Sequence, residues 1–212
     1  MNQTSVVSYL KRHWLKWQLR RAHDGDASAM KRIYRLEDPW NLNVPEEHAR
    51  FSETARLIRD RIGARFGSIL EVGCGEGLQT EYLASLADRV VGIDPSPLAI
   101  QRACGRRIKN ARFEFGELTS YVVRPVEPFD LVTACEMLYY LPDLEHAYQR
   151  LNALGKTCIA TYYPGVYERL DAFFQSKDVE FATIHGRSSE WRVVWWSNQL
   201  GGRLNGSKIQ KS

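Results

Sequence analysis

The chain has 212 residues, of which 44% are apolar and 25% charged, as is typical of one globular domain with a sizeable core. No apolar run reaches the roughly 18 to 20 residues that a membrane span requires. The four cysteines lie far apart without a Cys-x-x-Cys pair, which argues against a zinc site or a disulfide framework and favours reduced thiols in a cytoplasm.

The net charge of +4 comes from the two ends of the chain. Residues 1–23 carry five basic and no acidic side chains, and residues 198–212 carry three basic and none acidic. The body between them therefore holds 21 basic against 25 acidic side chains. A dedicated nucleic-acid binder needs a basic working face, so we expect no nucleic-acid partner.

The first third of the chain has helical patterns. Residues 5–21, "SVVSYLKRHWLKWQLRR", predict a short basic amphipathic helix, which either packs on its own domain or contacts a membrane surface or partner. A second helix is expected over 26–36, with Asp24 or Asp26 as its cap, followed by a turn around Pro39. Pro45 then suits the first turn of a third helix over 45–63.

From residue 68 onward, strands and helices alternate. Strands are expected at 68–73, 89–94, 111–116, 129–135 and 157–163, with helices at 77–87, 96–107, 143–153 and 165–176. The last two strands, 179–185 and 190–196, are joined only by "GRSS" and must form an antiparallel hairpin. The pattern predicts an α/β fold with a doubly wound, mostly parallel seven-stranded sheet that ends in an antiparallel hairpin.

The stretch "ILEVGCGEGLQTEYL" places three glycines, Gly73, Gly75 and Gly77, where a strand meets a helix. Such a turn lets a ligand lie against the backbone. A dinucleotide-binding turn needs its third glycine at position 78, which is Leu78 here. Glu71 would repel a diphosphate but attract a cationic or amino-bearing ligand.

Two further acids follow strand ends. Asp94 lies 21 residues beyond the first glycine and either accepts both hydroxyls of a ribose or, like Ser96, caps the next helix. Glu117 follows the third strand and either accepts from an exocyclic adenine amine or is an ordinary solvated loop acid.

These residues together resemble class I S-adenosylmethionine-dependent methyltransferases. "ILEVGCGEGLQTEYLASLADRVVGID" looks like motifs I and II of that family, "FGELTS" like its adenine-side motif and "FDLVTACEMLYYL" like its strand-four motif. "EDPWNLN", "AIQRAC" and "CEMLYYLPD" are similar to the nodulation-factor N-methyltransferases, which methylate the free amine of a deacetylated chitooligosaccharide. The resemblance covers about residues 37–163; the part after residue 164 gives no close match.

The resemblance implies S-adenosyl-L-methionine as cofactor, whose sulfonium and ammonium groups suit the acidic turn. It implies these cofactor-binding residues: Trp40, Glu71, Gly73, Cys74, Gly75, Asp94, Pro95, Glu117, Leu118 and Cys135. The glycine turn would pass under the methionine part, with Glu71 orienting it through a water or a backbone amide. Residues 1–66 would form a helical segment that covers the cofactor site, residues 67–197 the core, and residues 198–212 a polar tail.

An amine acceptor must lose its proton before it attacks, so Glu136 or a tyrosine is expected to take or steer that proton. Tyr139 and Tyr140 either wall the acceptor site or simply pack. The expected activity is methyl transfer to a small-molecule amine, with an amino sugar as the acceptor that the resemblance suggests. The alternatives are an O-methyltransferase acting on a sugar or secondary metabolite and a non-catalytic cofactor-binding protein. No metal site and no particular oligomeric state are predicted.

Overall fold

The computed structural model describes residues 17, 32–122 and 127–198. The predicted helix over 5–21 therefore lies outside the described residues except for Trp17, and so does most of the predicted helix over 26–36 with its caps. The tail beyond residue 198 lies outside them too. Within the described part of the chain, no helix combines the length and the apolar character needed to cross a membrane.

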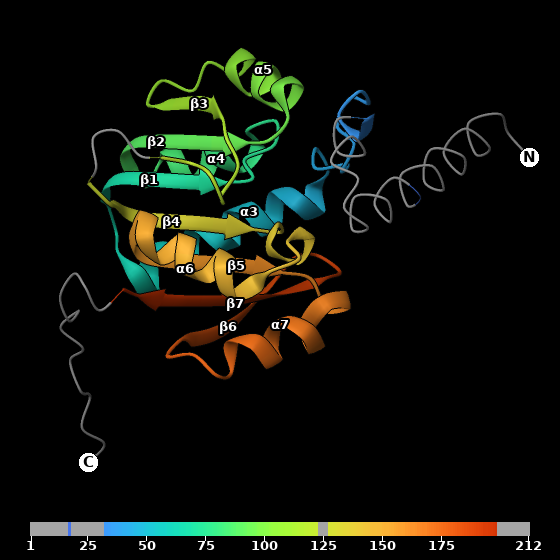
Figure 1. The fold of residues 1–212 in the computed structure, drawn as a ribbon. Coiled ribbons are helices and arrows are strands. Elements are labelled where there is room, and N and C mark those ends of the chain that lie inside the picture. Colours follow the sequence, from blue (N-terminus) through green and yellow to red (C-terminus); the bar gives the residue numbers. More distant parts are fainter. Residues whose placement is uncertain (1–16, 18–31, 123–126, 199–212) are drawn as a thin grey trace, which may run out of the picture.

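Seven strands form one sheet in the order β3-β2-β1-β4-β5-β7-β6 (Figure 1). They are β1 (Phe66–Val72), β2 (Ala87–Asp94), β3 (Ala111–Phe115), β4 (Phe129–Cys135), β5 (Gly155–Tyr162), β6 (Glu180–His185) and β7 (Glu190–Ser197). The first five are parallel, whereas β7 runs antiparallel to both β5 and β6. The predicted fold class and the C-terminal hairpin are thereby confirmed.

Helices cover both faces of this sheet. They are α3 (Pro45–Leu57), continued by a π-helical turn η1 (Ile58–Ile62), α4 (Leu78–Ala84), α5 (Pro97–Gly105), α6 (Leu144–Leu154) and α7 (Tyr167–Phe174). Two short 3-10 turns, η2 (Leu138–Tyr140) and η3 (Pro164–Val166), follow β4 and β5. Ser96 caps α5 and Asp143 caps α6, each accepting a backbone N–H in the first turn.

Where the structure describes the chain, the expected helices are present with shifted ends. The predicted helix over 45–63 changes from α to π geometry at Ile58, and the last predicted helix begins at Tyr167 after a 3-10 turn. The helical residues described before Pro39 end at residue 33, three positions earlier than predicted. Element ends are the least reliable part of a pattern-based prediction, because fraying and capping decide them locally.

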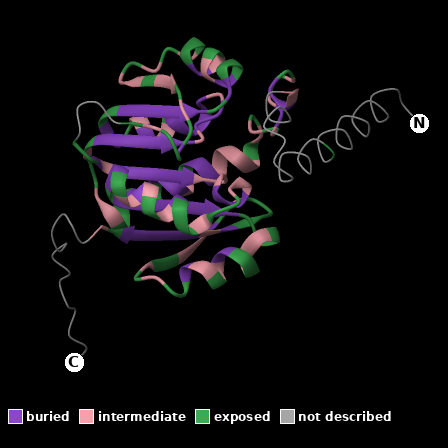
Figure 2. Ribbon diagram, in the orientation of Figure 1, coloured by how far each residue is buried: buried purple, intermediate pink, exposed green. Residues whose placement is uncertain are grey.

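The alternation of side chains along each strand creates two cores. Leu70 and Val72 of β1 face a core completed by α6 and α7, whereas Ile69 faces the other core, completed by α3 and α4. Strands β1, β2, β4, β5 and β7 are buried over most of their length, whereas the edge strands β3 and β6 are largely exposed or half-buried, and the helices expose their outer faces (Figure 2). The sheet grows in one direction from β1 to β3 and in the other from β4 onward, so the order switches between β1 and β4. Ligands of such sheets bind at the carboxyl ends of the strands beside this switch.

Candidate active site

A cavity of about 770 Å³ opens at the carboxyl ends of β1, β2 and β4. Its volume lies in the range typical of small-molecule sites. Eleven of the residues predicted from the sequence line it: Trp40, Glu71, Gly73, Cys74, Gly75, Asp94, Pro95, Cys135, Glu136, Tyr139 and Tyr140. The structure therefore brings together side chains from four separate stretches of the chain.

Glu117 and Leu118 do not line this cavity. Glu117 is exposed in the loop after β3, where its carbonyl accepts from the backbone N–H groups of Ser120 and Tyr121. Leu118 is buried in the core shared with α6. The resemblance placed this pair beside an adenine, and the cavity as it stands does not reach them.

The glycine turn has a backbone that only glycine adopts without strain. Gly73, Gly75 and Gly77 all have positive φ, at 73°, 53° and 78°. A Cβ at Gly73 would lie 3.1 Å from Cβ of Met137, and one at Gly77 would lie 3.0 Å from the Phe113 ring. The turn thus needs glycine both for its dihedral angles and for space.

Asp94 at the end of β2 ties this turn to the neighbouring strand. Its Oδ2 accepts from the backbone N–H of Gly75 at 3.0 Å, and its Oδ1 accepts from the N–H of Ser96 at 2.8 Å. The hydroxyl of Ser96 itself accepts from Ala99 N, so the capping role falls to Ser96. Asp94 is only 4% exposed, and burial raises the pKa of its carboxyl to about 6.

Glu71 lies beneath the turn and is also buried. It accepts a hydrogen bond from the hydroxyl of Thr80 on α4, a partner that the sequence prediction of a water or backbone amide did not include. Burial raises the pKa of the Glu71 carboxyl to about 7. A cation bound beside these two buried acids would therefore stabilise their ionised forms.

The cavity lining is strongly acidic. Among the described residues that line it, one carries a permanent positive charge, Arg50, whereas five are carboxylic acids: Glu47, Glu71, Asp94, Glu136 and Glu190. An excess of acids in a low-dielectric cavity attracts cationic ligands and repels phosphates.

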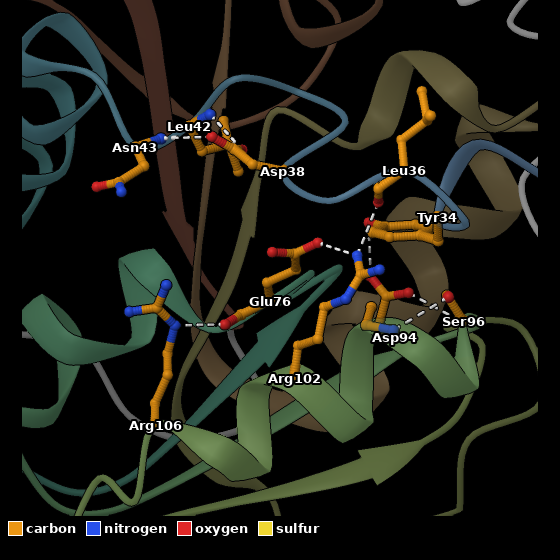
Figure 3. A network of polar contacts seen from close by, with 11 residues as sticks. Tyr34, Leu36, Asp38, Leu42, Asn43, Glu76, Asp94, Ser96, Arg102 and Arg106 are labelled. Carbon is orange, nitrogen blue, oxygen red and sulfur yellow. Dashed lines mark hydrogen bonds and ion pairs between the residues drawn. The ribbon is translucent and has the colours of Figure 1, made fainter.

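The segment before α3 folds over the turn (Figure 3). Nη1 of Arg102 on α5 donates to the carbonyl of Leu36 at 2.8 Å and to Oε1 of Glu76 in the glycine turn at 2.6 Å. Asp38 has a φ of 42°, and its carboxylate accepts from the backbone N–H of Leu42 at 2.7 Å, which closes the loop that carries Trp40. Trp40 thereby reaches the cavity beside the glycine turn.

Glu136 follows β4 in a strained backbone conformation, with a φ of 54°. Its carboxylate accepts from the hydroxyl of Tyr139 at 3.3 Å and from Oγ1 of Thr161 at 3.1 Å. Burial raises the pKa of Glu136, and the positive charge of Arg50 works against that rise. Burial also raises the pKa of Tyr139, so its phenol stays protonated and acts as a donor.

Aromatic rings form a wall from the N-terminal segment to η3. The ring centroids of Trp40 and Tyr140 lie 5.7 Å apart, those of Tyr140 and Tyr139 4.5 Å, and those of Tyr139 and Tyr163 5.3 Å. All four side chains line the cavity. Such a wall suits a sugar ring or an alkylated ammonium group.

Sequence reasoning missed Arg50, which is only 2% exposed. Its Nε donates to Glu47 at 2.7 Å, its Nη1 donates to Gln79 at 3.2 Å, and its guanidinium lies 4.6 Å from the Phe51 ring centroid. In the sequence, Glu47 and Arg50 are three residues apart on a helix, which is the spacing of an ordinary surface ion pair. The helical pattern therefore gave no sign that this pair is a cavity wall.

Sequence reasoning also missed four residues at the hairpin between β6 and β7: Ser188, Ser189, Glu190 and Trp191, all of which line the cavity. The "GRSS" loop predicted the hairpin, but the sequence did not show that the tip of this hairpin would lie at the cavity. The part of the chain that the structure describes contains no group of three or more His, Cys, Asp or Glu residues placed to hold a metal ion. The four cysteines are free.

Residues 22–158 match the family Nodulation protein S (NodS). Nodulation protein S from Bradyrhizobium diazoefficiens is 32% identical over 132 residues, which cover 62% of this chain and 62% of that protein. A ubiquinone biosynthesis O-methyltransferase from Xanthomonas euvesicatoria is 29% identical over 59% of this chain and 52% of its own length.

The fold has solved counterparts. The N-methyltransferase NodS from Bradyrhizobium japonicum, crystallised in complex with S-adenosyl-L-homocysteine, superposes with a TM-score of 0.67 and 24% identity over 81% of this chain and 97% of that chain. The matched part spans 50% to 62% of the length of the curated NodS relatives. Because the family match covers well over half of the chain, the chain belongs to the NodS family.

Proposed function

We propose that this chain is an S-adenosylmethionine-dependent methyltransferase that methylates the amine nitrogen of a small-molecule acceptor, with an amino sugar as the acceptor class. The observation that carries the proposal is the acidic cavity at the carboxyl ends of β1, β2 and β4, where the positive-φ glycines meet Asp94. The similarity to Nodulation protein S and to the solved N-methyltransferase NodS supports the reaction class.

The residues present fit this cofactor. Gly73, Cys74 and Gly75 offer a backbone surface without side-chain obstruction for the methionine part. Asp94 at the end of β2 would hold the ribose, and a positive charge bound beside the buried Glu71 would stabilise its ionised carboxylate. Trp40 and the segment held by Arg102 support the assignment of residues 1–66 as the cover of the cofactor.

When bound, the cofactor supplies a methyl group already activated by a sulfonium. The protein therefore has to align acceptor and donor, a contribution worth up to about 7–11 kcal/mol in favourable intramolecular reactions. Cys135 and Glu136 would form the floor of this transfer site, at the end of β4.

Glu136 accepts the proton of the acceptor ammonium in this proposal. Its raised pKa makes it a stronger base than an exposed carboxylate. Tyr139 donates a hydrogen bond to Glu136, and burial holds its own pKa high, so Tyr139 orients the base and does not replace it. Tyr139 and Tyr140 would also form part of the wall against which the acceptor lies.

One observation favours a second candidate, O-methylation. The ubiquinone biosynthesis O-methyltransferase from Xanthomonas euvesicatoria is similar over 59% of this chain, and a buried carboxylate such as Glu136 can also accept the proton of a phenol. The five acids of the cavity favour an acceptor that arrives as a cation, which an amine does and a phenol does not.

The decisive experiment has two steps. Calorimetric titration with S-adenosylhomocysteine, with NADH as the control, is expected to give micromolar binding of the first and none of the second. Methyl transfer is then measured to a fully deacetylated chitooligosaccharide and to its fully N-acetylated counterpart. Transfer only to the free amine supports the proposal, transfer to both points to a hydroxyl acceptor, and no binding of S-adenosylhomocysteine overturns the enzyme assignment.

A further inference from the structure

The hairpin tip, residues 186–189, lies at the rim of the cavity and is held there by a side chain from a distant part of the chain. Three consecutive backbone N–H groups of the tip donate to the carboxylate of Glu46 on α3. Arg187 N lies 3.0 Å from Oε2, and Ser188 N and Ser189 N lie 3.1 Å and 2.8 Å from Oε1. One carboxylate thus binds the tip across more than 140 positions of sequence.

The tip is shaped around this carboxylate. A Cβ at Gly186 would lie 2.5 Å from Oε1 of Glu46 and 2.8 Å from the ring of Trp191, so a larger residue would displace one of them. The backbone hydrogen bonds lower the pKa of Glu46, so the carboxylate is ionised at neutral pH and its bonds to the tip are charge-assisted.

The tip leads directly into the cavity wall. Ser188, Ser189, Glu190 and Trp191 line the cavity, on the side that also holds Arg50, whereas Glu46 does not line it. The guanidinium of Arg50 lies 5.9 Å from the centroid of the Trp191 ring. Helix α3 therefore has two parts in this wall. Glu46 holds the hairpin tip in place, and Arg50 is itself a residue of the wall.

In the order of the strands, this wall and the proposed cofactor groups come from different parts of the sheet. The glycine turn and Asp94 end β1 and β2, whereas β6 and β7 lie at the opposite edge of the sheet, with β4 and β5 between them. We propose that Glu46 is a positioning residue that fixes the hairpin tip as the acceptor-side wall of the cavity and so sets how tightly the acceptor binds, without a role in cofactor binding. The inference rests on the proposed function, because this wall contacts a substrate only if the protein binds a methyl acceptor.

The test compares E46Q and E46A with E53Q in the full chain. Glu53 is on the same helix, and its carboxylate accepts hydrogen bonds from the exposed Arg56 away from the hairpin, so it is a matched control. Backbone amide hydrogen exchange of residues 186–191 reads the hairpin directly. Calorimetry with S-adenosylhomocysteine reads the cofactor site, and initial rates with a fully deacetylated chitotetraose give KM and kcat.

In E46A, we expect exchange at residues 187–189 to rise roughly tenfold or more, because three amides lose their acceptor. The KM for the chitotetraose is expected to rise by about fivefold or more, while kcat and the affinity for S-adenosylhomocysteine stay within about twofold, since the groups that touch cofactor are unchanged. E46Q should lie between E46A and the wild type, because an amide oxygen still accepts but carries no charge. E53Q should behave as the wild type.

Unchanged hydrogen exchange would overturn the inference, and so would faster exchange with an unchanged KM. A fall in melting temperature with equal losses in KM, kcat and cofactor affinity would also overturn it, since that pattern belongs to general destabilisation. If the wild type neither binds S-adenosylhomocysteine nor methylates any amine, the proposed function fails and the acceptor-side role fails with it. Faster exchange in E46A would then establish the hairpin contact alone.

Discussion

The proposed cofactor end and the proposed acceptor end of the cavity differ in how the chain builds them. The proposed cofactor end is formed mainly by backbone and side chains at the ends of adjacent strands, β1 and β2, within the stretch from Glu71 to Asp94, with Trp40 added from the segment before α3. The acceptor end is formed by side chains from α3, the end of β4 and the β6–β7 hairpin, which are far apart in sequence.

Because of this difference, substitutions at the two ends are expected to have different effects. At the cofactor end, backbone dihedral angles and close packing decide the geometry, so small substitutions there are expected to weaken cofactor binding. At the acceptor end, ionisable and aromatic side chains decide the chemistry, so substitutions there are expected to affect turnover or acceptor binding. The predictions below test that division.

The largest effect is expected from Glu136→Gln, which removes the proposed base but keeps the shape of the side chain. We expect kcat to fall by about 100-fold or more, within the range of a lost general base, with affinity for S-adenosylhomocysteine within about twofold. Initial rates and calorimetry measure the two. Glu145→Gln is the control, because that exposed carboxylate pairs with Lys177 outside the cavity. Equal losses in rate and affinity would make Glu136 a binding residue.

Asp94→Ala should weaken cofactor binding by about 1–3 kcal/mol, as expected for the loss of a hydrogen-bonded ionic contact. Calorimetric titration with S-adenosylhomocysteine measures the change. Asp88→Ala on the same strand is the matched control, because Asp88 is exposed and pairs with Arg65 away from the cavity. Unchanged affinity in Asp94→Ala would restrict Asp94 to holding the backbone of Gly75 and Ser96.

Gly73→Ala tests whether the turn needs glycine. A φ of 73° strains any residue with a Cβ by about 1–2 kcal/mol, and the added methyl would crowd Met137. We expect cofactor affinity to fall about tenfold together with a lower melting temperature. In Gly105→Ala, nothing lies within 4 Å of the added Cβ, so that variant should match the wild type or exceed its stability. Equal behaviour of the two variants would contradict the requirement.

The smallest effect concerns pH. The folded-state pKa values of Glu71 and Asp94, about 7 and about 6, lie above their ordinary values of 4.5 and 3.8. The folded protein therefore binds more protons than the unfolded chain in this window, and these two acids lower stability as the pH rises from about 4 to 7. A bound cation opposes that loss by favouring the ionised carboxylates.

We accordingly expect the melting-temperature increase caused by S-adenosylmethionine to be larger at pH 8 than at pH 5.5. S-adenosylhomocysteine, which lacks the sulfonium charge, should give a smaller difference between the two pH values. Thermal shifts with each ligand at both pH values measure this. An identical pH response for the two ligands would remove the sulfonium from the electrostatic explanation.

Most of the fold followed from the sequence because its signals are local. The continuous buried run of β1, the short "GRSS" loop and the cap at Ser96 each depend on residues a few positions apart. The positive φ of all three glycines agrees with the tight turn predicted between strand and helix. The same locality explains why Gly73, Gly75 and Asp94 were found in the sequence, since each closes a strand whose neighbour is adjacent along the chain.

By itself, the sequence determined the doubly wound sheet and the acidic glycine turn, because strand period, turn chemistry and strand-end position are properties of short stretches. Only the tertiary structure decided that Arg50 is buried against Glu47 and Gln79, that Glu117 does not line the cavity, and that Glu46 holds the hairpin tip over it. Those contacts join residues up to 143 positions apart. Their partners are selected by how helices pack on the sheet, and no local pattern in the chain encodes that packing.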